Sequence, residues 1–414
     1  MRKIYTLCLL SLSLVFAASA QTTPQLKSGS IYSMSCANVS MEIDSAVGGR
    51  ISSLKVFDPA NNTTVEFLNQ GTDPNQFGST FWTSPQLAWY PSASWPPIPT
   101  LDKQPYSVKI EGNTILLTGS MDPTLRLRFY KKIHFNPADT SLVITYTVKN
   151  ENYTPKSWAP WEVTRVLASG LTVFKMGDGS VTGTLKSNIQ GRIYETTDGY
   201  AWYNQSAVEN LVTTSGGDKL MSDGKGWLAH MPSSKNRILI KRFDDIALAK
   251  AAPGESEVQV YTAQNNAYTE LENQGAYVSI PGLDSISWTV RWYARVLPFK
   301  STYVVSGSSK VKAFIDQVVN RGDNIYLGIN NQVAETTNIF VNAAQGYMMV
   351  QTNLTSYNNA ELLVYDLQGK LALKQSLKDP QQQVSVKGLA AGNYLYQINT
   401  GSSSIAKGKF LINR

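Results

Sequence analysis

The stretch LRLRFYKKIHFNPADTSLVITYTV, residues 125–148, contains two runs in which apolar and polar side chains alternate. Alternation with a period of two is typical of a β-strand that buries one face and exposes the other. The runs 125–135 and 142–148 are separated by Asn136-Pro137, a pair that favours a turn. This stretch therefore predicts two strands joined by a turn.

The same pattern continues on both sides of this stretch. Short β-rich segments lie at 40–43, 51–56, 107–110, 258–262 and 288–295, and Gly, Pro and Asn residues separate them. Many short strands punctuated in this way predict an all-β sandwich or barrel. The one convincing helical segment is 308–319, which we expect to act as a hinge between two units.

The composition is that of a globular protein with more than one core. The chain has 414 residues, 42% hydrophobic and 16% charged, with 21 Tyr and 9 Trp. Its formal net charge is +7, and the basic residues are scattered rather than clustered. We interpret this as ordinary surface charge and expect no nucleic-acid partner.

The N-terminus is predicted to be a signal peptide, residues 1–20. Arg2 and Lys3 precede the apolar run 7–16, and Ala18-Ser19-Ala20 is a small-residue cleavage pattern. Removal of these residues takes away two basic residues and no acid, so the charge of +7 becomes +5. The alternative is an uncleaved anchor, although the run is short for a membrane span. No later stretch is apolar enough to cross a bilayer, so no transmembrane segment is expected.

Cysteine and histidine are scarce. Cys8 lies in the predicted signal peptide, which leaves Cys36 alone and excludes an internal disulfide in the mature chain. With two histidines and one remaining cysteine, a zinc or iron site built from N and S ligands is not expected. We predict no cofactor and no metal site.

Three features define the C-terminal segment 338–414. The run 361–370, ELLVYDLQGK, is a strand that enters a tight turn at Gly369; the run 388–398, GLAAGNYLYQI, is a turn followed by an alternating strand; and 407–412, KGKFLI, is a basic terminal strand. In this order they resemble the type A sorting domain of bacterial type IX secretion, although the early Y-P-N-P element is replaced by 340–343, FVNA. The alternative is a fibronectin-like accessory module.

The longer N-terminal part carries four weaker landmarks. They are 46–54 (AVGGRISSL), 158–165 (WAPWEVTR), 270–274 (ELENQ) and the closing pair of Pro281-Gly282 with 288–290 (WTV). In this order they resemble the galactose-mutarotase-like superfamily of aldose epimerases, and most of all its uncharacterised secreted branch. The resemblance implies a β-supersandwich of large antiparallel sheets packed face to face, followed by a small immunoglobulin-like C-terminal β-sandwich.

These observations predict four segments. Residues 1–20 are the signal peptide, 21–298 the mutarotase-like β-supersandwich, 299–337 a linker with a short helix, and 338–414 the C-terminal sorting domain. We expect the chain to pass through the periplasm and to be secreted or displayed on the outer cell surface, with the type IX secretion machinery as its partner. The alternative fates of the sorting domain, retention or cleavage, stay open.

The resemblance places Glu272 where aldose epimerases carry their catalytic base. Ring opening also requires an acid, usually a histidine, and the matching position holds Trp161 or Glu162. His134 and His230 match no histidine of the family. A Glu162–Glu272 pair could still transfer protons, hold sugar hydroxyls or bind Ca²⁺. The structural alternative is that Glu162 pairs with Arg165 or with another cation.

Strand parity makes these predictions specific. Glu270 and Glu272 lie on one face of their strand, and we expect this face to meet water or ligand because an unpaired buried carboxylate is costly. Arg165 has the opposite parity from Glu162, so it needs a turn or bulge to join the same site. We expect Glu162, Arg165, Glu272, Gln86, Trp82 and Trp89 to converge at one concave end of the sandwich.

The Pro-rich and aromatic stretch 81–97 supplies three members of this set. We predict an ordered loop in which Trp82 and Trp89 present flat faces for sugar stacking, while Gln86 and Arg165 give directional hydrogen bonds. The alternative is that these rings only cover an exposed end of the sandwich.

Three functions remain open. The sequence favours a glycan-binding protein over a carbohydrate-active enzyme of the epimerase type, because the histidine acid is missing. The third hypothesis is a structural surface protein without a small ligand. The sequence contains no nucleophile elbow, P-loop, HExxH or GxGxxG motif.

Overall fold

The structure is a computed structural model that divides the chain into two units. It describes residues 21–71, 76–89, 97–179, 182–183, 194–204, 218–232, 236–263, 267–320, 338–342, 346–352, 357, 359–366, 368–400 and 403–412. The predicted signal peptide, residues 1–20, lies outside the described residues. The N-terminal unit spans Met1–Leu327 and the C-terminal unit spans Gly328–Arg414.

The first large sheet of the N-terminal unit has twelve strands among the described residues, and its main path runs β1-β2-β3-β4-β6-β11-β20-β19-β16-β13. Two further strands join this path at its side, β5 beside β4 and β21 beside β11. The strands are β1 (Gln25–Ser28), β2 (Ile31–Cys36), β3 (Val39–Asp44), β4 (Arg50–Asp58), β5 (Thr63–Glu66), β6 (Ser79–Ser84), β11 (Lys156–Val166), β13 (Thr182–Gly183), β16 (Asp218–Ser222), β19 (Val258–Thr262), β20 (Thr269–Gln274) and β21 (Val278–Ile280).

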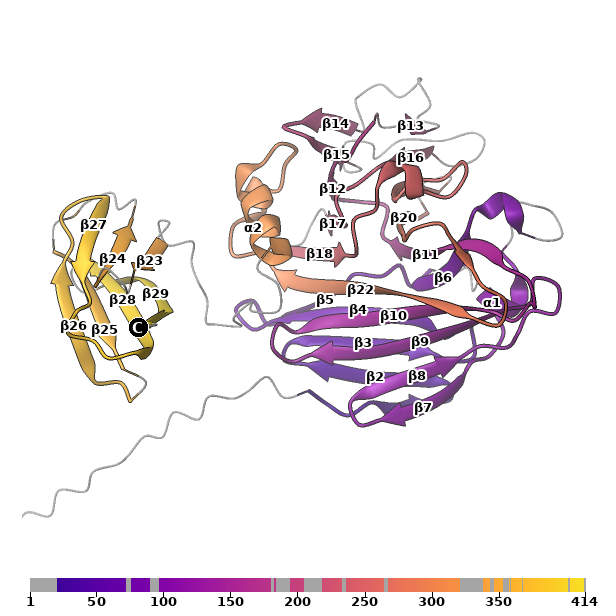
Figure 1. The fold of residues 1–414 in the computed structure, drawn as a ribbon, viewed down its shortest axis with the longest axis horizontal. Coiled ribbons are helices and arrows are strands. Elements are labelled where there is room, and N and C mark those ends of the chain that lie inside the picture. Colours follow the sequence, from indigo (N-terminus) through magenta and orange to yellow (C-terminus); the bar gives the residue numbers. More distant parts are fainter. Residues whose placement is uncertain are drawn as a thin grey trace, which may run out of the picture. The chain divides into compact units, whose positions relative to one another are not determined.

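The second sheet has ten described strands in the order β14-β15-β12-β17-β18-β22-β10-β9-β8-β7. They are β7 (Ser107–Glu111), β8 (Thr114–Thr118), β9 (Leu127–Asn136), β10 (Ser141–Asn150), β12 (Leu171–Lys175), β14 (Tyr194–Thr197), β15 (Tyr200–Asn204), β17 (Trp227–Met231), β18 (Arg237–Arg242) and β22 (Ser285–Val296). Figure 1 shows both sheets in the N-terminal unit.

The two sheets pack face to face around one core. Phe81 of β6 stacks on Tyr146 of β10 with ring centroids 4.2 Å apart, so side chains of the two sheets meet directly. Strands β9 and β10 form the hairpin of the opening stretch, with Asn136 opposite Ser141. Every strand pair that the structure describes is antiparallel, so the predicted all-β class with large antiparallel sheets is confirmed.

The prediction of a loop over 81–97 is wrong at its beginning. Strand β6 continues to Ser84, because its residues pair with β11 from Ser79 opposite Thr164 to Ser84 opposite Ala159. The short 3-10 helix η1 (Gln86–Ala88) follows, and residues 90–96 lie outside the described part of the chain. The sequence signal of Pro85 therefore marks the end of a strand.

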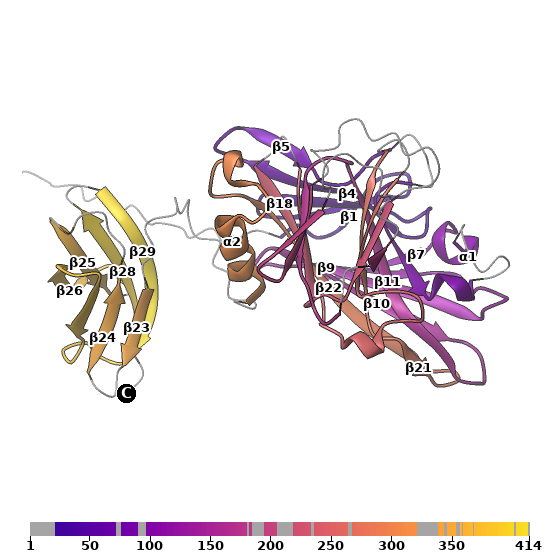
Figure 2. The same ribbon diagram turned by 90° about the horizontal axis from the view of Figure 1, so that it is seen from above.

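Helices are few and peripheral. The N-terminal unit contains α1 (Pro99–Asp102), η3 (Leu248–Lys250), η5 (Ser301–Tyr303) and α2 (Ser309–Asn320). Helix α2 buries Val311, Ile315 and Val318, spaced as one face of a helix. These residues share a core cluster with Ile238 and Ile240 of β18, and Figure 2 shows α2 beside that strand. The helix lies within the segment 299–337 that the sequence analysis treats as a linker.

The C-terminal unit is a small sandwich of two antiparallel sheets. One contains β23 (Asn338–Asn342), β24 (Tyr347–Gln351) and β27 (Gln381–Ser385). The other has the order β26 (Leu371–Ser376), β25 (Ala360–Tyr365), β28 (Gly392–Thr400) and β29 (Ser403–Ile412). Their inner faces share a core that includes Met348, Leu362, Ile398 and Phe410. This arrangement confirms the predicted small C-terminal β-sandwich.

Candidate functional site

Strand β11 separates the predicted site residues by strand parity. The strand pairs without interruption with β20, from Trp161 opposite Gln274 to Val166 opposite Thr269. Because side chains alternate along a strand, Glu162 lies on one face, and Trp161 and Arg165 lie on the other. Glu270 is opposite Arg165 in the register, so the two share a face. The register thus divides the six predicted residues between two environments.

The prediction that Glu162 and Glu272 form one site is wrong. Glu162 points toward the second sheet, where its carboxylate accepts hydrogen bonds from Tyr146 Oη (2.7 Å) and Trp292 Nε1 (3.2 Å). Lys241 Nζ completes an ion pair with Glu162 at 2.8 Å, and both side chains are fully buried. Burial lowers the pKa of Lys241, and the Glu162 carboxylate opposes that shift. The alternative of a structural partner for Glu162 is correct, with Lys241 as the cation.

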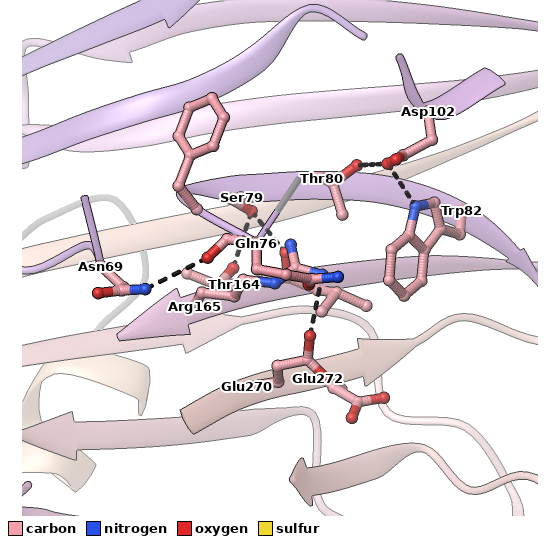
Figure 3. A network of polar contacts seen from close by, with 12 residues as sticks. Asn69, Gln76, Ser79, Thr80, Trp82, Asp102, Thr164, Arg165, Glu270 and Glu272 are labelled. Carbon is pink, nitrogen blue, oxygen red and sulfur yellow. Dashed lines mark hydrogen bonds and ion pairs between the residues drawn. The ribbon is translucent and has the colours of Figure 1, made fainter. Parts of the chain in front are cut away.

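The opposite face of β11, which we call the outer face, carries Arg165. Its Nη2 lies 2.9 Å from Glu270 Oε1, an ion pair that Figure 3 shows. The guanidinium lies near two aromatic rings, 5.5 Å from the centroid of Trp82 and 5.7 Å from that of Tyr268. Arg165 needs no bulge to reach this face, because it is Glu162 that faces the other way.

Three indole rings gather on the outer face. Trp82 lies 5.3 Å from Trp161 and 5.4 Å from Trp89 between ring centroids. Trp82 Nε1 donates to Asp102 Oδ1 of α1, and Trp89 Nε1 donates to the Thr83 carbonyl. The three rings are at most 5% exposed. They therefore pack against one another and offer no open face for stacking, in agreement with the alternative that they cover the sandwich.

Helix α1 lies close to the sheet because Gly48 has no side chain. A Cβ at Gly48, whose φ is +64°, would lie 2.0 Å from the Asp102 carbonyl oxygen. This close approach lets Asp102 accept hydrogen bonds from Trp82 and from Thr80 Oγ1 (2.8 Å), as Figure 3 shows. Asp102 also forms a buried ion pair with Arg50. The helix thereby fixes the Trp82 ring on the outer face.

Glu272 is the candidate carboxylate of this face and is 1% exposed. Its Oε2 accepts a hydrogen bond from Trp161 Nε1 at 3.0 Å and forms an ion pair with Lys219 Nζ at 3.2 Å. Its Oε1 has no hydrogen-bond partner among the described residues. Burial raises the pKa of Glu272 to about 7; Lys219 opposes the rise, and Glu270 and Glu255 add to it. Of the two surroundings expected for this carboxylate, water or ligand, its burial excludes open water.

Trp161 and Glu162 are the two residues considered from the sequence for the position of the epimerase histidine. Of the two residues that the sequence analysis considered, only Trp161 lies on the same face as Glu272 and contacts it. An indole N–H donates a hydrogen bond but is not a proton-transfer group at neutral pH. The two histidines lie elsewhere, His134 on β9 and His230 on β17 of the second sheet.

Gln86 joins the outer face through its backbone. Its N–H donates to Glu255 Oε1 at 3.1 Å, and Glu255 Oε2 accepts from Gln259 Nε2 at 2.8 Å and from Gln274 Nε2 at 3.4 Å. Gln259 and Gln274 are fully buried, and the Oε1 atom of each has no partner in the described part of the chain. Of the six predicted residues, the outer face thus carries Arg165, Glu272, Trp82 and Trp89, and Gln86 contacts it through its backbone, whereas Glu162 lies on the other face. Their convergence at one concave end stays a prediction.

Several residues that were not predicted from the sequence complete this group. We call the outer-face cluster the set Arg165, Lys219, Glu255, Gln259, Glu270, Glu272 and Gln274. Lys219 is its most accessible cation, with a side chain 25% exposed. Burial lowers the pKa of Lys219, but the carboxylates of Glu272, Glu255 and Glu270 outweigh burial and raise it. Gln274 could have been predicted from the sequence, because it lies on the same strand as Glu272 with the same parity. Lys219 could not, because it lies on β16, two strands away from β20 in the sheet.

No group of three or more His, Cys, Asp or Glu side chains among the described residues is arranged to hold a metal ion. No helix in the described part of the chain has the length and apolar character to cross a membrane.

Comparison with solved structures finds proteins that resemble this chain at low sequence identity. A galactose mutarotase-like protein from Lactobacillus casei is 10% identical, with a TM-score of 0.45, over 67% of this chain and 100% of its own. A putative aldose 1-epimerase from Escherichia coli is 9% identical, with a TM-score of 0.41, over 67% of this chain and 100% of its own. A galactose mutarotase-like protein from Clostridium acetobutylicum is 11% identical, with a TM-score of 0.41, over 67% of this chain and 99% of its own.

Comparison with protein families identifies the C-terminal unit. No curated protein matches the sequence. Residues 338–413 match the family model described as the secretion system C-terminal sorting domain, which starts at the residue that the sequence analysis predicts. This match places residues 338–413 in the sorting-domain family and indicates that the chain is exported to the outer cell surface or secreted.

Proposed function

We propose that the N-terminal unit is an exported carbohydrate-binding domain that binds its ligand at the outer-face cluster without chemical turnover. The observation that carries the proposal is the 3.0 Å hydrogen bond from Trp161 Nε1 to Glu272 Oε2. By the sequence resemblance, Glu272 is the carboxylate of an epimerase-like site. Its partner here is the indole of Trp161, which only donates a hydrogen bond and cannot transfer a proton.

The polar groups of the cluster suit a ligand rich in hydroxyl groups. Glu272, Gln259 and Gln274 each have an oxygen with no hydrogen-bond partner among the described residues. A buried polar atom without a partner costs about 1–3 kcal/mol, which a donated hydrogen bond recovers. Sugar hydroxyls are such donors. Lys219 could in turn donate to a sugar oxygen from its partly exposed position.

The same cluster is poorly equipped for acid/base catalysis. Glu272, with a pKa of about 7, could act as a general base or acid near neutral pH. The other ionisable neighbour in contact with it is Lys219, whose raised pKa keeps it protonated and makes it a weak acid. Ring opening needs both a base and an acid, and Glu272 can supply only one of them. The cluster is therefore better suited to binding a sugar than to opening its ring.

Carbohydrate-active enzyme is the second candidate function, because the pKa of Glu272 lies near neutrality. The third, a surface protein without a small ligand, is favoured by the burial of the cluster. We propose the domain bounds that the sequence predicts, 1–20 signal peptide, 21–298 carbohydrate-binding unit, 299–337 linker and 338–414 sorting domain, with helix α2 of the linker segment packed against the carbohydrate-binding unit.

Saturation-transfer NMR and polarimetry on the exported chain separate the three functions. The panel would contain glucose, galactose, mannose, N-acetylglucosamine and their oligosaccharides, with α-D-galactose as the polarimetry substrate. We expect binding of at least one sugar, no acceleration of mutarotation, and weakening by about tenfold in Glu272→Gln, which corresponds to about 1.4 kcal/mol.

The matched control is Glu111→Gln, which makes the same change at an exposed position on β7. It should bind like the wild type. Mutarotation by the wild type that Glu272→Gln abolishes would establish the enzyme instead. Absence of binding across the whole panel would contradict the proposal and favour the structural protein.

A further inference from the structure

The second sheet of the C-terminal unit has one face in the core and one face outward. Leu362 and Val364 of β25 and Ile398 of β28 point into the core and are fully buried. Side chains alternate, so the residues between them point outward. The outward face therefore contains Leu363 and Tyr365 of β25 and their cross-strand neighbours.

Apolar residues of three neighbouring strands form a row on this outward face. In the register of the sheet, Leu371 of β26 is opposite Tyr365 of β25, and Tyr365 is opposite Leu395 of β28. Leu411 of β29 is opposite Asn393 of β28, next to this row on the same outward face. Leu371, Leu395 and Leu411 are 46%, 39% and 48% exposed. A group of large exposed side chains on one face is a feature of interaction surfaces.

Basic residues surround this row. Lys409 is opposite Leu395, and Lys407 is opposite Gln397 on the same face; both lysines are exposed. Lys374, opposite Leu363, pairs with Glu361 at 3.0 Å. Glu361 is the single acidic residue among the described outward positions of the four strands. The face is thus apolar along its middle and positively charged at its side.

We infer that this outward face of β26-β25-β28-β29 is the surface by which the C-terminal unit docks onto a protein of the secretion machinery. The family match indicates that the unit is handled by a secretion system, and the face gives the chemistry of the partner. Its complement is an apolar patch bordered by carboxylates, because Leu371, Leu395 and Leu411 would be covered while Lys407 and Lys409 meet opposite charge.

A second copy of the chain fits this face less well. Two identical basic faces would bring lysines against lysines, and like charges in contact oppose association. An anionic lipid surface shares the charge complementarity, but the apolar residues and the lysines beside them hold fixed positions in the register of the sheet. That arrangement fits a partner with a defined pattern, so the lipid surface is treated as an outcome of the test.

The test measures export of the full chain in a bacterium with a type IX system. The first variant, Lys407→Glu with Lys409→Glu, reverses two exposed charges and removes no buried apolar surface. The second, Leu395→Ser with Leu411→Ser, removes the apolar part of the face. We expect the ratio of surface to periplasmic protein, measured by protease accessibility and immunoblotting, to fall by about tenfold in each.

Two controls are matched to these variants. Lys407→Arg with Lys409→Arg keeps both charges, and Leu26→Ser alters a leucine of the N-terminal unit that is 57% exposed. Both should be exported within about twofold of the wild type, a difference below 1 kcal/mol. Hydrogen exchange of Gly392–Thr400 in the purified full chain verifies that each variant is folded.

Two results would overturn the inference. A folded charge-reversal variant that reaches the surface like the wild type would exclude the basic part of the face from docking. If the wild type binds phosphatidylglycerol vesicles and the charge-reversal variant loses that binding together with export, the partner is a lipid surface and not a protein. Absence of vesicle binding with loss of export supports the protein partner.

Discussion

The Glu162–Lys241 ion pair gives a quantitative prediction about what holds the two sheets together. Glu162 belongs to β11 of the first sheet and Lys241 to β18 of the second, with 2.8 Å between Oε2 and Nζ and no exposed side-chain surface on either residue. Lys241 Nζ also donates to Thr164 Oγ1 at 2.8 Å and to the Leu271 carbonyl at 3.0 Å. The ammonium therefore satisfies three acceptors on the first sheet.

Substitution of Lys241 by Met removes the charge and keeps the apolar stem. Glu162 would retain its hydrogen bonds from Tyr146 and Trp292 but would lose its counter-charge in the core. Breaking one partner of a buried pair costs about 3–5 kcal/mol. The two bonds that Glu162 keeps place the expected loss for Lys241→Met near the lower end, about 3 kcal/mol. In Lys241→Met with Glu162→Gln neither charge remains, so most of this loss should be recovered.

Urea unfolding followed by tryptophan fluorescence measures this effect. All nine tryptophans lie between Trp82 and Trp292, so the signal reports on the N-terminal unit alone. The control is Lys132→Met, the same change at an exposed position of β9, which should alter the free energy of unfolding by less than about 0.5 kcal/mol. A loss below about 1 kcal/mol in Lys241→Met, or a double variant as unstable as the single one, would refute the reasoning.

Three further predictions concern titration and export. Between about pH 4.5 and 7 the folded chain retains a proton on Glu272 that the unfolded chain has released, so the free energy of unfolding should fall by about 3 kcal/mol as pH rises through this window. Glu272→Gln should remove that fall from the urea profile, and an unchanged profile would contradict the raised pKa. Burial lowers the pKa of His230 to about 3, so the unfolded chain binds this proton first and stability should fall as pH drops below 6.5. His230→Gln should lessen this loss in acid, and equal acid sensitivity of variant and wild type would exclude His230 as its source. Deletion of 338–414 should leave the protein in the periplasm, as cell fractionation would show, and normal surface delivery would refute the role of this segment.

The alternating stretches determined the class of the fold before any tertiary information. The pattern of 125–148 led to the β9–β10 hairpin, and the three motifs of 361–412 led to a sandwich with the sorting-domain match. Parity along 270–274 also placed Glu270 and Glu272 on one face, as the register of β20 has them. These features are local, because a period of two and a turn depend on neighbouring residues alone.

Only the tertiary structure decided which face of β11 is the core. Alternation shows that Glu162 and Arg165 face opposite ways, but either face could have been covered by the second sheet. The choice depends on Lys241, which pairs with Glu162 from the second sheet and compensates for the burial of its charge. Lys241 lies 77 residues after Thr164, the neighbour of Glu162 that it also contacts, so this pairing is not a local feature of the sequence. In the same way Lys219 and Trp161 meet at Glu272 through strand pairings among β11, β20, β19 and β16 that join segments distant in sequence. Pairing partners of this kind are set by the packing of the whole domain, which is why a single sequence predicted the strands and their faces but not the environment of each carboxylate.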